Sequence, residues 1–357
     1  MRRLPIFFVV DVSESMVADL PKVDKGLQMI VKELSSDPYA LETVFISTIA
    51  FAGRCKVLNP LTEVYSLNIP RLPLGGGTDY GEAFTCLMRE IDRNVVKTTI
   101  NQKGDWKPLV FFFTDGNPTS SSYKRVFDKW RNEYSRKASV IAFSLAAKLD
   151  YSILGQITEQ IYLLDDMDDE TVKGFFKWVS ASIQTNSVAV GDNKIVSEDR
   201  LMKDEAGEKV HKINLKKESR TGPGRDDIAG DESVRVVIGK CAKHKKRYID
   251  LYRKDDVGIF LEKGCFAVPD EHAYDELSSS TGSGSDLDMS RVQHKDNCNC
   301  PHCNNPVIIT KCSCGRIFCC NPDREKSVDG CMQLDCPWCG NTGYYQFGSF
   351  SVGTGLG

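Results

Sequence analysis

The sequence predicts an α/β fold for the first half of the chain, with a doubly wound, mostly parallel sheet. A small β segment and a cysteine-rich, zinc-ribbon-like domain are expected to follow. Three observations support this. From residue 5 to about 186, short apolar runs alternate with longer amphipathic ones. A charged stretch without aromatic residues separates Trp178 from Tyr248. Ten of the 14 cysteines lie between Cys298 and Cys339, counting both ends.

Four apolar runs rich in Val, Ile and Phe are predicted to be strands buried on both faces of a sheet: Ile6–Val10, Thr43–Phe51, Leu109–Phe113 and Val140–Leu145. Four longer stretches have helical spacing: Pro21–Leu34, Tyr80–Val96, Ser122–Arg136 and Asp168–Ile183. Strands and helices that alternate in this way form a mostly parallel sheet with helices on both sides. Ligands of such sheets bind at the carboxyl ends of the strands.

Composition divides the chain into five segments. Residues 1–186 form the α/β domain, and residues 187–232 form a charged linker with too little apolar surface to join two cores. In residues 233–277, VRVVIGKC and KRYIDLYRKDDVGIFLEKGCFAV alternate apolar and polar residues like antiparallel strands. SSSTGSGSD marks a flexible insertion over residues 278–295, and residues 296–350 form the cysteine-rich domain.

The composition favours a cytoplasmic protein. The net charge is −3, and no run of roughly 20 apolar residues is present to span a bilayer. The basic start of the chain is similar to a secretion signal, but the apolar run Leu4–Val10 is short and ends at Asp11. We therefore expect no membrane anchor and no strongly basic nucleic-acid surface, and we expect the clustered cysteines to bind metal.

Three polar fragments lie at predicted strand ends or in nearby loops: DVSES, GGGTDYG and FFFTDG. Together they resemble the metal-ion-dependent adhesion site of von Willebrand factor A domains, which have a Rossmann-like fold. The pattern of that site is D-x-S-x-S, a loop threonine, and an aspartate after the fourth strand. The resemblance covers about the first half of the chain, and it assigns the site to Asp11, Ser13, Ser15, Thr78 and Asp115.

These residue types suit magnesium, with manganese or calcium as alternatives. Mg²⁺ takes six oxygens at roughly 2.0–2.1 Å and retains waters readily. Ser13, Ser15 and Thr78 would supply hydroxyls, while Asp11 and Asp115 would hold coordinated waters. Because hydroxyl ligands are neutral, the ion keeps most of its charge and can attract a carboxylate from another molecule.

Simpler interpretations exist for each fragment alone. The two serines could cap the helix that begins near Pro21, and Asp115 with Gly116 could form an ordinary turn. The glycine run 75–77 is similar to a phosphate-binding loop, but no Gly-Lys-Ser/Thr follows it. All three fragments in order, near strand ends, favour the metal site.

The cysteine-rich region predicts zinc. CPHC and CPWCG are two C-x-x-C knuckles, and two such turns close a tetrahedral site: Cys300, Cys303, Cys336 and Cys339. Their separation exceeds the roughly 15–20 residues of a simple ribbon, which favours a second, inserted cluster. That cluster would draw on five further cysteines, which could also exchange partners with the knuckles: Cys312, Cys314, Cys319, Cys320 and Cys331.

The other cysteines have less support as ligands. Cys298 and His302 are spare candidates. Core packing is the expectation for Cys241 and Cys265, whose spacing matches no knuckle, and also for Cys55 and Cys86. Four- or eight-thiolate zinc is structural, so we expect one or two zinc ions that fold the domain and perform no catalysis.

The whole architecture resembles the TerY-type proteins of bacterial tellurium-resistance and stress-response clusters. The features that carry this resemblance are the A domain, the segment GKC…KKRYIDLY, and the tail with CPHC, CSCG and CPWCG. The resemblance implies a cytoplasmic binding protein that works beside a protein kinase and a metal-dependent protein phosphatase.

We therefore expect a non-enzymatic adaptor that captures a partner's acidic side chain through the metal. One alternative is a subunit that couples an AAA+ ATPase to a client. Another is nucleic-acid binding by the zinc ribbon, although acidic residues offset its basic ones. An enzyme has the least support, because all five histidines lie outside the predicted A domain and none forms a recognisable nucleophile pattern. The acidic run LLDDMDDE is expected at a helix amino-terminus.

Overall fold

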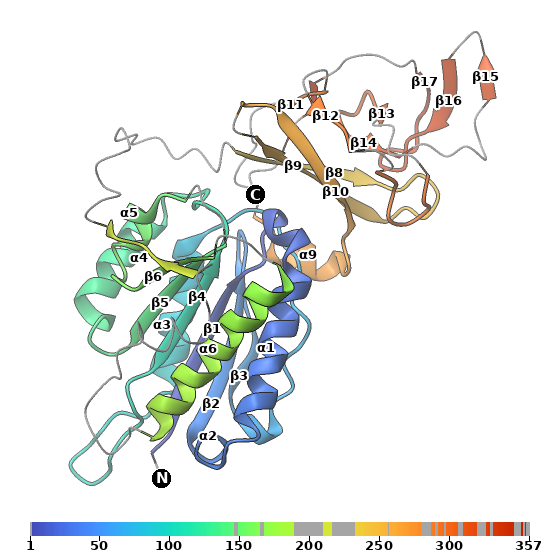
Figure 1. The fold of residues 1–357 in the computed structure, drawn as a ribbon. Coiled ribbons are helices and arrows are strands. Elements are labelled where there is room, and N and C mark those ends of the chain that lie inside the picture. Colours follow the sequence, from blue (N-terminus) through green and yellow to red (C-terminus); the bar gives the residue numbers. More distant parts are fainter. Residues whose placement is uncertain are drawn as a thin grey trace.

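The protein is described here from a computed structural model (Figure 1). It describes residues 2–145, 149–164, 168–188, 210–215, 233–255, 257–279, 287–289, 292–295, 298–305, 310–319, 326–328, 331–345, 351–352 and 354. Among these residues, no helix has both the length and the apolar character that crossing a membrane requires.

The amino-terminal domain is built on a seven-stranded sheet of order β3-β2-β1-β4-β5-β6-β7. Its five central strands are parallel, and an antiparallel strand lies at each edge. The parallel strands are β1 (Leu4–Asp11), β2 (Val44–Phe51), β4 (Leu109–Thr114), β5 (Ser139–Ser144) and β6 (Ile161–Leu164). The edge strands are β3 (Cys55–Glu63) and β7 (Val210–Lys212).

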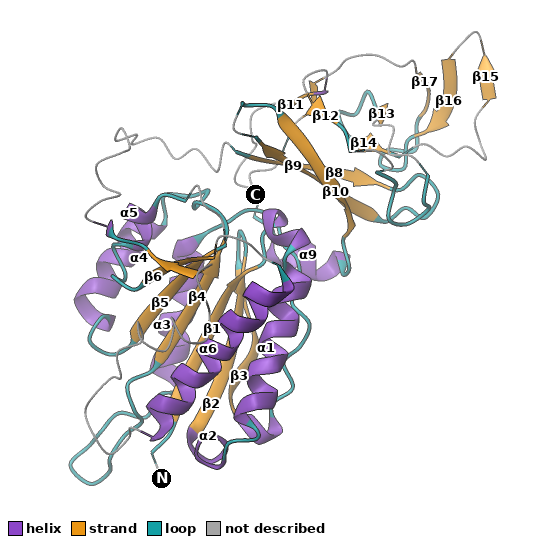
Figure 2. Cartoon of the chain, viewed as in Figure 1, coloured by secondary structure: helices purple, strands orange, loops and turns teal. Residues whose placement is uncertain are grey.

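Helices cover both faces of this sheet, as Figure 2 shows. Because successive side chains of a strand point to opposite faces, Phe8 and Val10 pack into one core while Phe7 and Val9 pack into the other. The first core is closed by α1 (Leu20–Leu34) and α6 (Asp169–Val188), and the second by α3 (Tyr80–Asn94) and α4 (Tyr123–Lys129). Shorter helices are η1 (Glu14–Ala18), α2 (Pro38–Thr43), η2 (Val64–Ser66), η3 (Trp130–Tyr134) and α5 (Tyr151–Leu154).

The predicted fold class is confirmed, and the four predicted strands and four predicted helices are present within a few residues of their expected ends. The structure adds β3, β6, α2 and α5, which the sequence analysis did not identify. The predicted helix Ser122–Arg136 is divided, since α4 passes into the π-helical turn η3. In the acidic run LLDDMDDE, Leu163 and Leu164 end β6, and Asp168 accepts a hydrogen bond from the Thr171 amide near the start of α6 (2.7 Å).

The predicted linker 187–232 differs from the structure in two places. Helix α6 continues to Val188, and β7 pairs with β6 at the edge of the sheet. Apolar contact explains this, because Val210 packs into the first core. The remainder of this linker, apart from residues 213–215, lies outside the described residues.

The carboxy-terminal module, meaning the described residues from 233 onward, contains a six-stranded sheet of order β12-β10-β9-β8-β14-β13. Strands β8 (Val234–Lys240), β9 (Arg247–Lys254) and β10 (Phe260–Ala267) are antiparallel, as predicted. The cysteine-rich region joins the same sheet through β12 (Val292–Gln293), β13 (Thr310–Lys311) and β14 (Ile317–Phe318). The β segment and the cysteine-rich region therefore form one structural unit.

Besides this sheet, the described part of the module has six smaller elements. Helix α9 (Glu271–Leu277) follows β10. A two-stranded pair consists of β11 (Leu287–Asp288) and β18 (Ser351–Val352). A three-stranded sheet consists of β15 (Lys326–Val328), β16 (Cys331–Asp335) and β17 (Thr342–Tyr345). Of the predicted flexible insertion 278–295, the residues 280–286 and 290–291 lie outside the described part.

The module sits over the carboxyl ends of β1 and β4 (Figure 1). Its apolar residues Val236, Leu251 and Leu277 belong to the same buried cluster as β1 and α1. The Arg54 amide donates to the Leu277 carbonyl at 2.8 Å. The sequence predicted too little apolar surface in the linker to join the two cores, and it gave no sign of this contact, which β8, β9 and α9 make instead.

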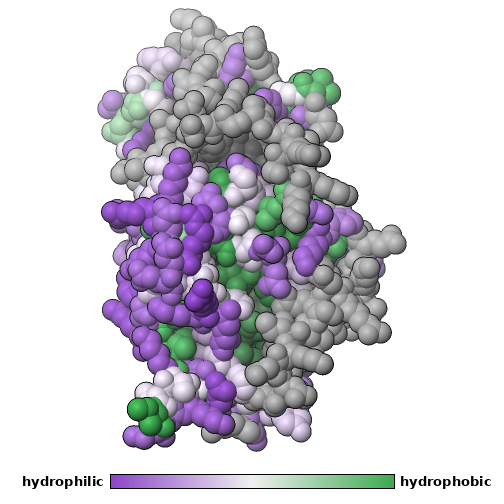
Figure 3. All heavy atoms as spheres, turned by 90° about the vertical axis from the view of Figure 1, so that its left-hand side faces the viewer, coloured by the Kyte–Doolittle hydropathy of each residue, from purple (hydrophilic) through white to green (hydrophobic). Residues whose placement is uncertain are grey.

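The side of the amino-terminal domain on which α4 and α5 lie has a different character. Figure 3 shows mainly hydrophilic side chains there, with hydrophobic ones in small patches. This side therefore looks like an ordinary solvated surface, and the contact with the module is made at the end of the sheet instead.

Candidate metal centres

The adhesion-site residues meet at the carboxyl ends of β1 and β4. Asp11 ends β1, and Asp115 directly follows β4, its parallel neighbour. Ser13 lies in the turn that leads from β1 into η1, and Ser15 is the second residue of η1. The loop that carries Thr78 is tied to this turn, since the Gly75 amide donates to the Val12 carbonyl at 2.8 Å.

Hydrogen bonds connect four of the five predicted residues. The Ser13 amide donates to Asp11 Oδ1 at 2.9 Å, and the Ser13 and Ser15 hydroxyls are 3.0 Å apart. The Ser15 hydroxyl donates to Asp115 Oδ1 at 2.7 Å. Thr114 was not identified from the sequence, and its hydroxyl donates to Asp11 Oδ2 at 2.6 Å. The two serine hydroxyls therefore lie between two oriented carboxylates, so the simple helix-cap interpretation does not describe them.

Thr78 completes the set in a different way. Its hydroxyl oxygen is buried and has no hydrogen-bond partner within the described part of the chain. Leaving such a group unsatisfied typically costs about 1–3 kcal/mol. A hard cation that takes hydroxyl oxygens would satisfy it, and the Ser13, Ser15 and Thr78 hydroxyls with two carboxylates form the donor set that magnesium prefers. The residues present fit a divalent metal.

Burial affects the protonation of this site. Asp11 is fully buried, and this burial together with the charge of Asp115 raises the pKa of the Asp11 carboxyl to about 7. All five residues are at most 2% exposed. The ionised carboxylates therefore repel each other in a buried site, and a bound cation would compensate that repulsion.

The module covers this site directly. Nη2 of Arg253, on β9, lies 3.4 Å from Asp115 Oδ2 and 3.3 Å from the Ser15 carbonyl oxygen. On the other side, the Tyr274 hydroxyl of α9 donates to Glu14, whose pKa burial raises to about 7. The sequence offered no signal for these contacts, because the partners are more than 130 residues apart.

The glycine run 75–77 has a structural role in this contact. A Cβ atom at position 75 would lie 2.6 Å from Cβ of Leu277, and Gly77 has φ +83°, which favours glycine. The Gly76 amide donates to the Ser278 hydroxyl at 2.8 Å. The glycines thus allow the loop to approach the end of α9, and Ser278 is anchored here although the sequence analysis placed it in a flexible insertion.

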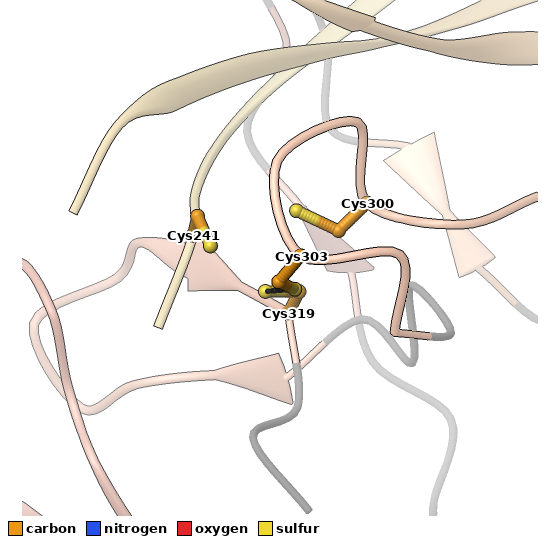
Figure 4. A group of neighbouring side chains, drawn as sticks. All are labelled: Cys241, Cys300, Cys303 and Cys319. Carbon is orange, nitrogen blue, oxygen red and sulfur yellow. Dashed lines mark hydrogen bonds between the residues drawn. The ribbon is translucent and has the colours of Figure 1, made fainter. Parts of the chain in front are cut away.

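The first cysteine cluster joins β8, the CPHC knuckle and the end of β14. Figure 4 shows Cys241, Cys300, Cys303 and Cys319, whose sulfur atoms all lie within 4.8 Å of one another. Two backbone amides donate to this cluster, that of Ala242 to Cys319 and that of His244 to Cys241, both at 3.3 Å. A hydrogen bond from Cys319 lowers the pKa of the Cys300 thiol to about 5, which favours the thiolate that metals bind.

The second cluster joins CSCG to CPWCG. It consists of Cys312, Cys314, Cys336 and Cys339, again within 4.8 Å. The sulfur of Cys312 lies 3.7 Å from that of Cys339, and the sulfur of Cys314 lies 3.9 Å from that of Cys336. A tetrahedron with zinc–sulfur bonds of about 2.3 Å has edges of about 3.8 Å. In the first cluster the sulfurs of Cys303 and Cys319 are also 3.7 Å apart. Both clusters therefore have the ligand number of a closed tetrahedral thiolate site, and these distances match its spacing.

The two predicted knuckles do not share a site. Each C-x-x-C pair meets a different second pair, because the strands between them separate CPHC from CPWCG. Of the cysteines proposed for the inserted cluster, Cys319 joins the first site, while Cys312 and Cys314 join the second. Cys320 and the side chain of Cys331 lie outside the described residues. His302 belongs to neither cluster, and its ring lies 2.8 Å from the Arg247 carbonyl oxygen.

Cys241 is the ligand that the sequence analysis missed, since core packing was expected for it. Its turn is built like those of the knuckles: the Lys245 amide donates to the Cys241 carbonyl, as the Asn304 amide does to Cys300. Lys245 has φ 58° and Asn304 φ 59°. The available signal was C-x-x-H, from Cys241 to His244, which has knuckle spacing with histidine in the second position. Cys55 and Cys86, by contrast, belong to none of the cysteine clusters among the described residues.

Comparisons with known proteins agree with this division of the chain. A family model described as the TerY-C metal binding domain matches residues 231–357, and one described as the von Willebrand factor type A domain matches residues 6–117. A search of curated proteins found no match.

Several solved structures align with about half of this chain. A von Willebrand factor type A protein from Catenulispora acidiphila is 14% identical over 51% of this chain and 43% of its own, with a TM-score of 0.41. VWA2, an ArnB paralog from Sulfolobus acidocaldarius, is 14% identical over 52% and 45%, with a TM-score of 0.35. Proximal thread matrix protein 1 of the mussel byssus, with a zinc occupied MIDAS motif, is 15% identical over 52% and 46%, with a TM-score of 0.35. The alignments thus span less than half of each of these relatives.

Proposed function

Since the chain belongs to the TerY-type proteins, with a von Willebrand factor type A domain followed by a TerY-C metal binding domain, we propose that it is a non-enzymatic, metal-dependent protein-binding adaptor. In this proposal the adhesion site receives a carboxylate of a partner protein, and the cysteine-rich module provides a second contact surface. The family resemblance implies a bacterial tellurite or stress response as the setting, with a protein kinase and a metal-dependent protein phosphatase as partners.

Two observations carry this proposal: the cluster of two serine hydroxyls and two carboxylates, and the buried hydroxyl of Thr78, which has no hydrogen-bond partner among the described residues and lies in a loop tied to the same turn. Ser13, Ser15 and Thr78 would hold a magnesium or manganese ion, and Asp11 and Asp115 would orient its waters. Bound there, such an ion supplies an electrophilic position that can accept a carboxylate oxygen from outside the chain. The chain itself holds the hydroxyls of Ser13, Ser15 and Thr78 in place around the ion.

Access to the site requires a change in the module. Because all five site residues are at most 2% exposed, a partner's carboxylate reaches them only when β9 and α9 move away. The contacts to be broken include Arg253 with Asp115 and Tyr274 with Glu14. We therefore propose that the chain alternates between a closed form and an open form that binds its partner.

A reducing compartment such as the cytoplasm agrees with the cysteine chemistry. The 12 cysteines whose side chains the structure describes are free of disulfides, and eight of them form the two clusters. Thiolate clusters of this kind persist where thiols stay reduced. Four-thiolate sites also leave no open position for a substrate, which supports a structural role for zinc in the module.

Capture of partners by the full, zinc-loaded chain, with and without magnesium, tests this function. Bound proteins are cross-linked and identified by mass spectrometry. Asp11→Asn keeps the shape of the side chain but removes the negative charge that would orient the waters on the ion. Asp79→Asn is the matched control, since Asp79 caps α3 beside Thr78 through the Glu82 amide. We expect a partner that requires magnesium, is lost with Asp11→Asn and is retained with Asp79→Asn. Binding that needs no magnesium and is retained with Asp11→Asn would contradict the proposal.

A further inference from the structure

A third group of metal-ligating side chains lies in the module, apart from both cysteine clusters. Asp250 on β9, Glu262 and Cys265 on β10, and Cys298 bring their ligand atoms within 4.8 Å of one another. Asp250 and Glu262 are buried, and the two cysteines are half-buried. Sequence analysis assigned Cys265 to the core and left Cys298 as a spare ligand.

A β-bulge creates this arrangement. Residues three apart on a regular strand point to opposite faces, so Glu262 and Cys265 would normally lie on opposite sides of the sheet. The register shifts between Glu262 and Gly264, and Gly264 has φ +149°. The extra residue places Glu262 and Cys265 on one face, with Asp250 directly opposite Cys265 on the neighbouring strand.

The site has an unsatisfied buried acceptor. Asp250 is fully buried, and its Oδ2 accepts a hydrogen bond from the Tyr252 hydroxyl, whereas Oδ1 has no hydrogen-bond partner in the part of the chain that the structure describes. The burial of Asp250 and its closeness to Glu262 raise the pKa of the Asp250 carboxyl to about 8. Two carboxyl groups and two thiols thus face one another, and none of these four side chains carries a positive charge.

Surrounding groups hold Glu262 in position. Its Oε2 lies 3.0 Å from Nδ1 of His294 and accepts a hydrogen bond from the Lys295 amide, also at 3.0 Å. The Cys298 amide donates to the Lys295 carbonyl at 3.3 Å, which ties the backbone of the second cysteine to a residue that also bonds Glu262. Metal-binding carboxylates commonly have such outer hydrogen bonds, which orient them toward the ion.

We propose that Asp250, Glu262, Cys265 and Cys298 form a third metal site, which takes a divalent cation of the zinc type. Zinc is the ion that accepts both thiolate and carboxylate ligands in a tetrahedral arrangement, whereas magnesium and calcium take oxygen ligands. The thiols pass their protons to solvent as they become ligands. The ion links β9 and β10 to the start of the cysteine-rich region, and this role does not depend on the adhesion site.

The test is the zinc content of the full chain, purified without chelators and kept in excess magnesium, measured by elemental analysis. We expect three equivalents of zinc in the wild type and two in the Cys265→Ser/Cys298→Ser variant. Cys55→Ser is the control for loss of a thiol outside the clusters, and it should keep three. Cobalt substitution gives a second readout. The thiolate-to-cobalt absorption of the double variant should lack the part that comes from the two thiolates of the third site.

Two results would overturn the third site. One is a wild-type content of two equivalents, and the other is an unchanged content in the double variant. If the double variant fails to fold and loses all its zinc, Glu262→Gln decides, since it keeps both thiols and the shape of the side chain. That variant should lose one equivalent, and retention of all three would exclude Glu262 as a ligand and overturn the proposed site.

Discussion

The adhesion site and the two cysteine clusters differ in what holds their residues in place. Asp11 and Asp115 end or follow strands whose side chains fill two large apolar cores. The cysteine clusters lie in a small core in which most of the buried members are themselves cysteines, and the rest are Ala242, Tyr248, Phe318 and Leu334. In the first region the fold positions the site, whereas in the second the metal-binding side chains are the core.

This difference determines how each region responds to the loss of its metal. Because its strands fill two large apolar cores, we expect the amino-terminal sheet to stay folded without a cation. The cysteine region buries little besides its own ligands, so metal-binding free energy has to supply most of its stability. The contact through β8, β9 and α9 then couples the stable region to the dependent one.

The largest expected effect follows removal of zinc. Because structural zinc contributes on the order of 10 kcal/mol, we expect a strong chelator to unfold residues 296–345 while the amino-terminal sheet stays folded. Amide hydrogen exchange, read segment by segment, measures this. Protection of the cysteine region that survives complete removal of zinc would show that its apolar core suffices, and the contrast between the two regions would disappear.

A smaller effect is expected at the contact between the regions. Leu277 is buried beside Gly75 and belongs to the same apolar cluster as Ala52, so Leu277→Ala should lower the free energy of unfolding of the amino-terminal domain by about 2–4 kcal/mol. Urea unfolding of the full chain measures it. Leu334→Ala is the matched control, because this leucine is equally buried but belongs to the cysteine core. Equal effects of the two variants on that transition would argue against direct coupling through α9.

Arg253 should have a moderate effect on metal binding. Its guanidinium offsets the charge of Asp115, so Arg253→Ala should strengthen manganese binding at the adhesion site, by about 3- to 10-fold. Arg247→Ala serves as the control, since that arginine pairs with Asp275 instead. Manganese titration followed by electron paramagnetic resonance measures both variants. Unchanged or weaker manganese binding with Arg253→Ala would show that the charge of Arg253 does not compete with the metal for Asp115.

The smallest effect is expected from the exposed ion pair between the two regions. Lys56 and Glu276 lie 2.7 Å apart, but both side chains are more than 40% exposed. Exposed pairs contribute little to stability, so Lys56→Ala should leave the urea midpoint of unfolding almost unchanged. A clearly lower midpoint in the same urea experiment would mean that surface charge, more than apolar contact, joins the regions.

Four of the five adhesion-site residues could be identified from the sequence because they end or follow β1 and β4, whose apolar patterns are visible in it, whereas Thr78 was assigned by the loop pattern GGGTDYG. Parallel strands place their carboxyl ends along one edge, so local fragments such as DVSES and FFFTDG were sufficient. The covering of the site was not predictable in this way. Arg253 and Tyr274 reach it only because distant strands and a helix pack there, and no local pattern encodes that contact.

The cysteine sites show a related limit. Spacing identified the knuckles, since two thiols on one tight turn have a local signature. Which knuckle meets which pair depends on the strands between them, and Cys241 lies 59 positions before Cys300. The third cluster was harder still to predict from the sequence, because it depends on a bulge at Gly264 that changes the face of the sheet on which Cys265 lies.

The most direct test of the adhesion site is the Thr78→Val variant, examined with and without manganese. Valine has the shape of threonine but lacks the buried hydroxyl that has no hydrogen-bond partner among the described residues. Without added metal, the variant should be as stable as the wild type or up to about 1 kcal/mol more stable, because an unsatisfied group is removed. Manganese binding, measured by titration calorimetry, should weaken at least about 10-fold, which corresponds to about 1.4 kcal/mol. A Thr78→Val protein that binds manganese as tightly as the wild type would contradict the account of this site.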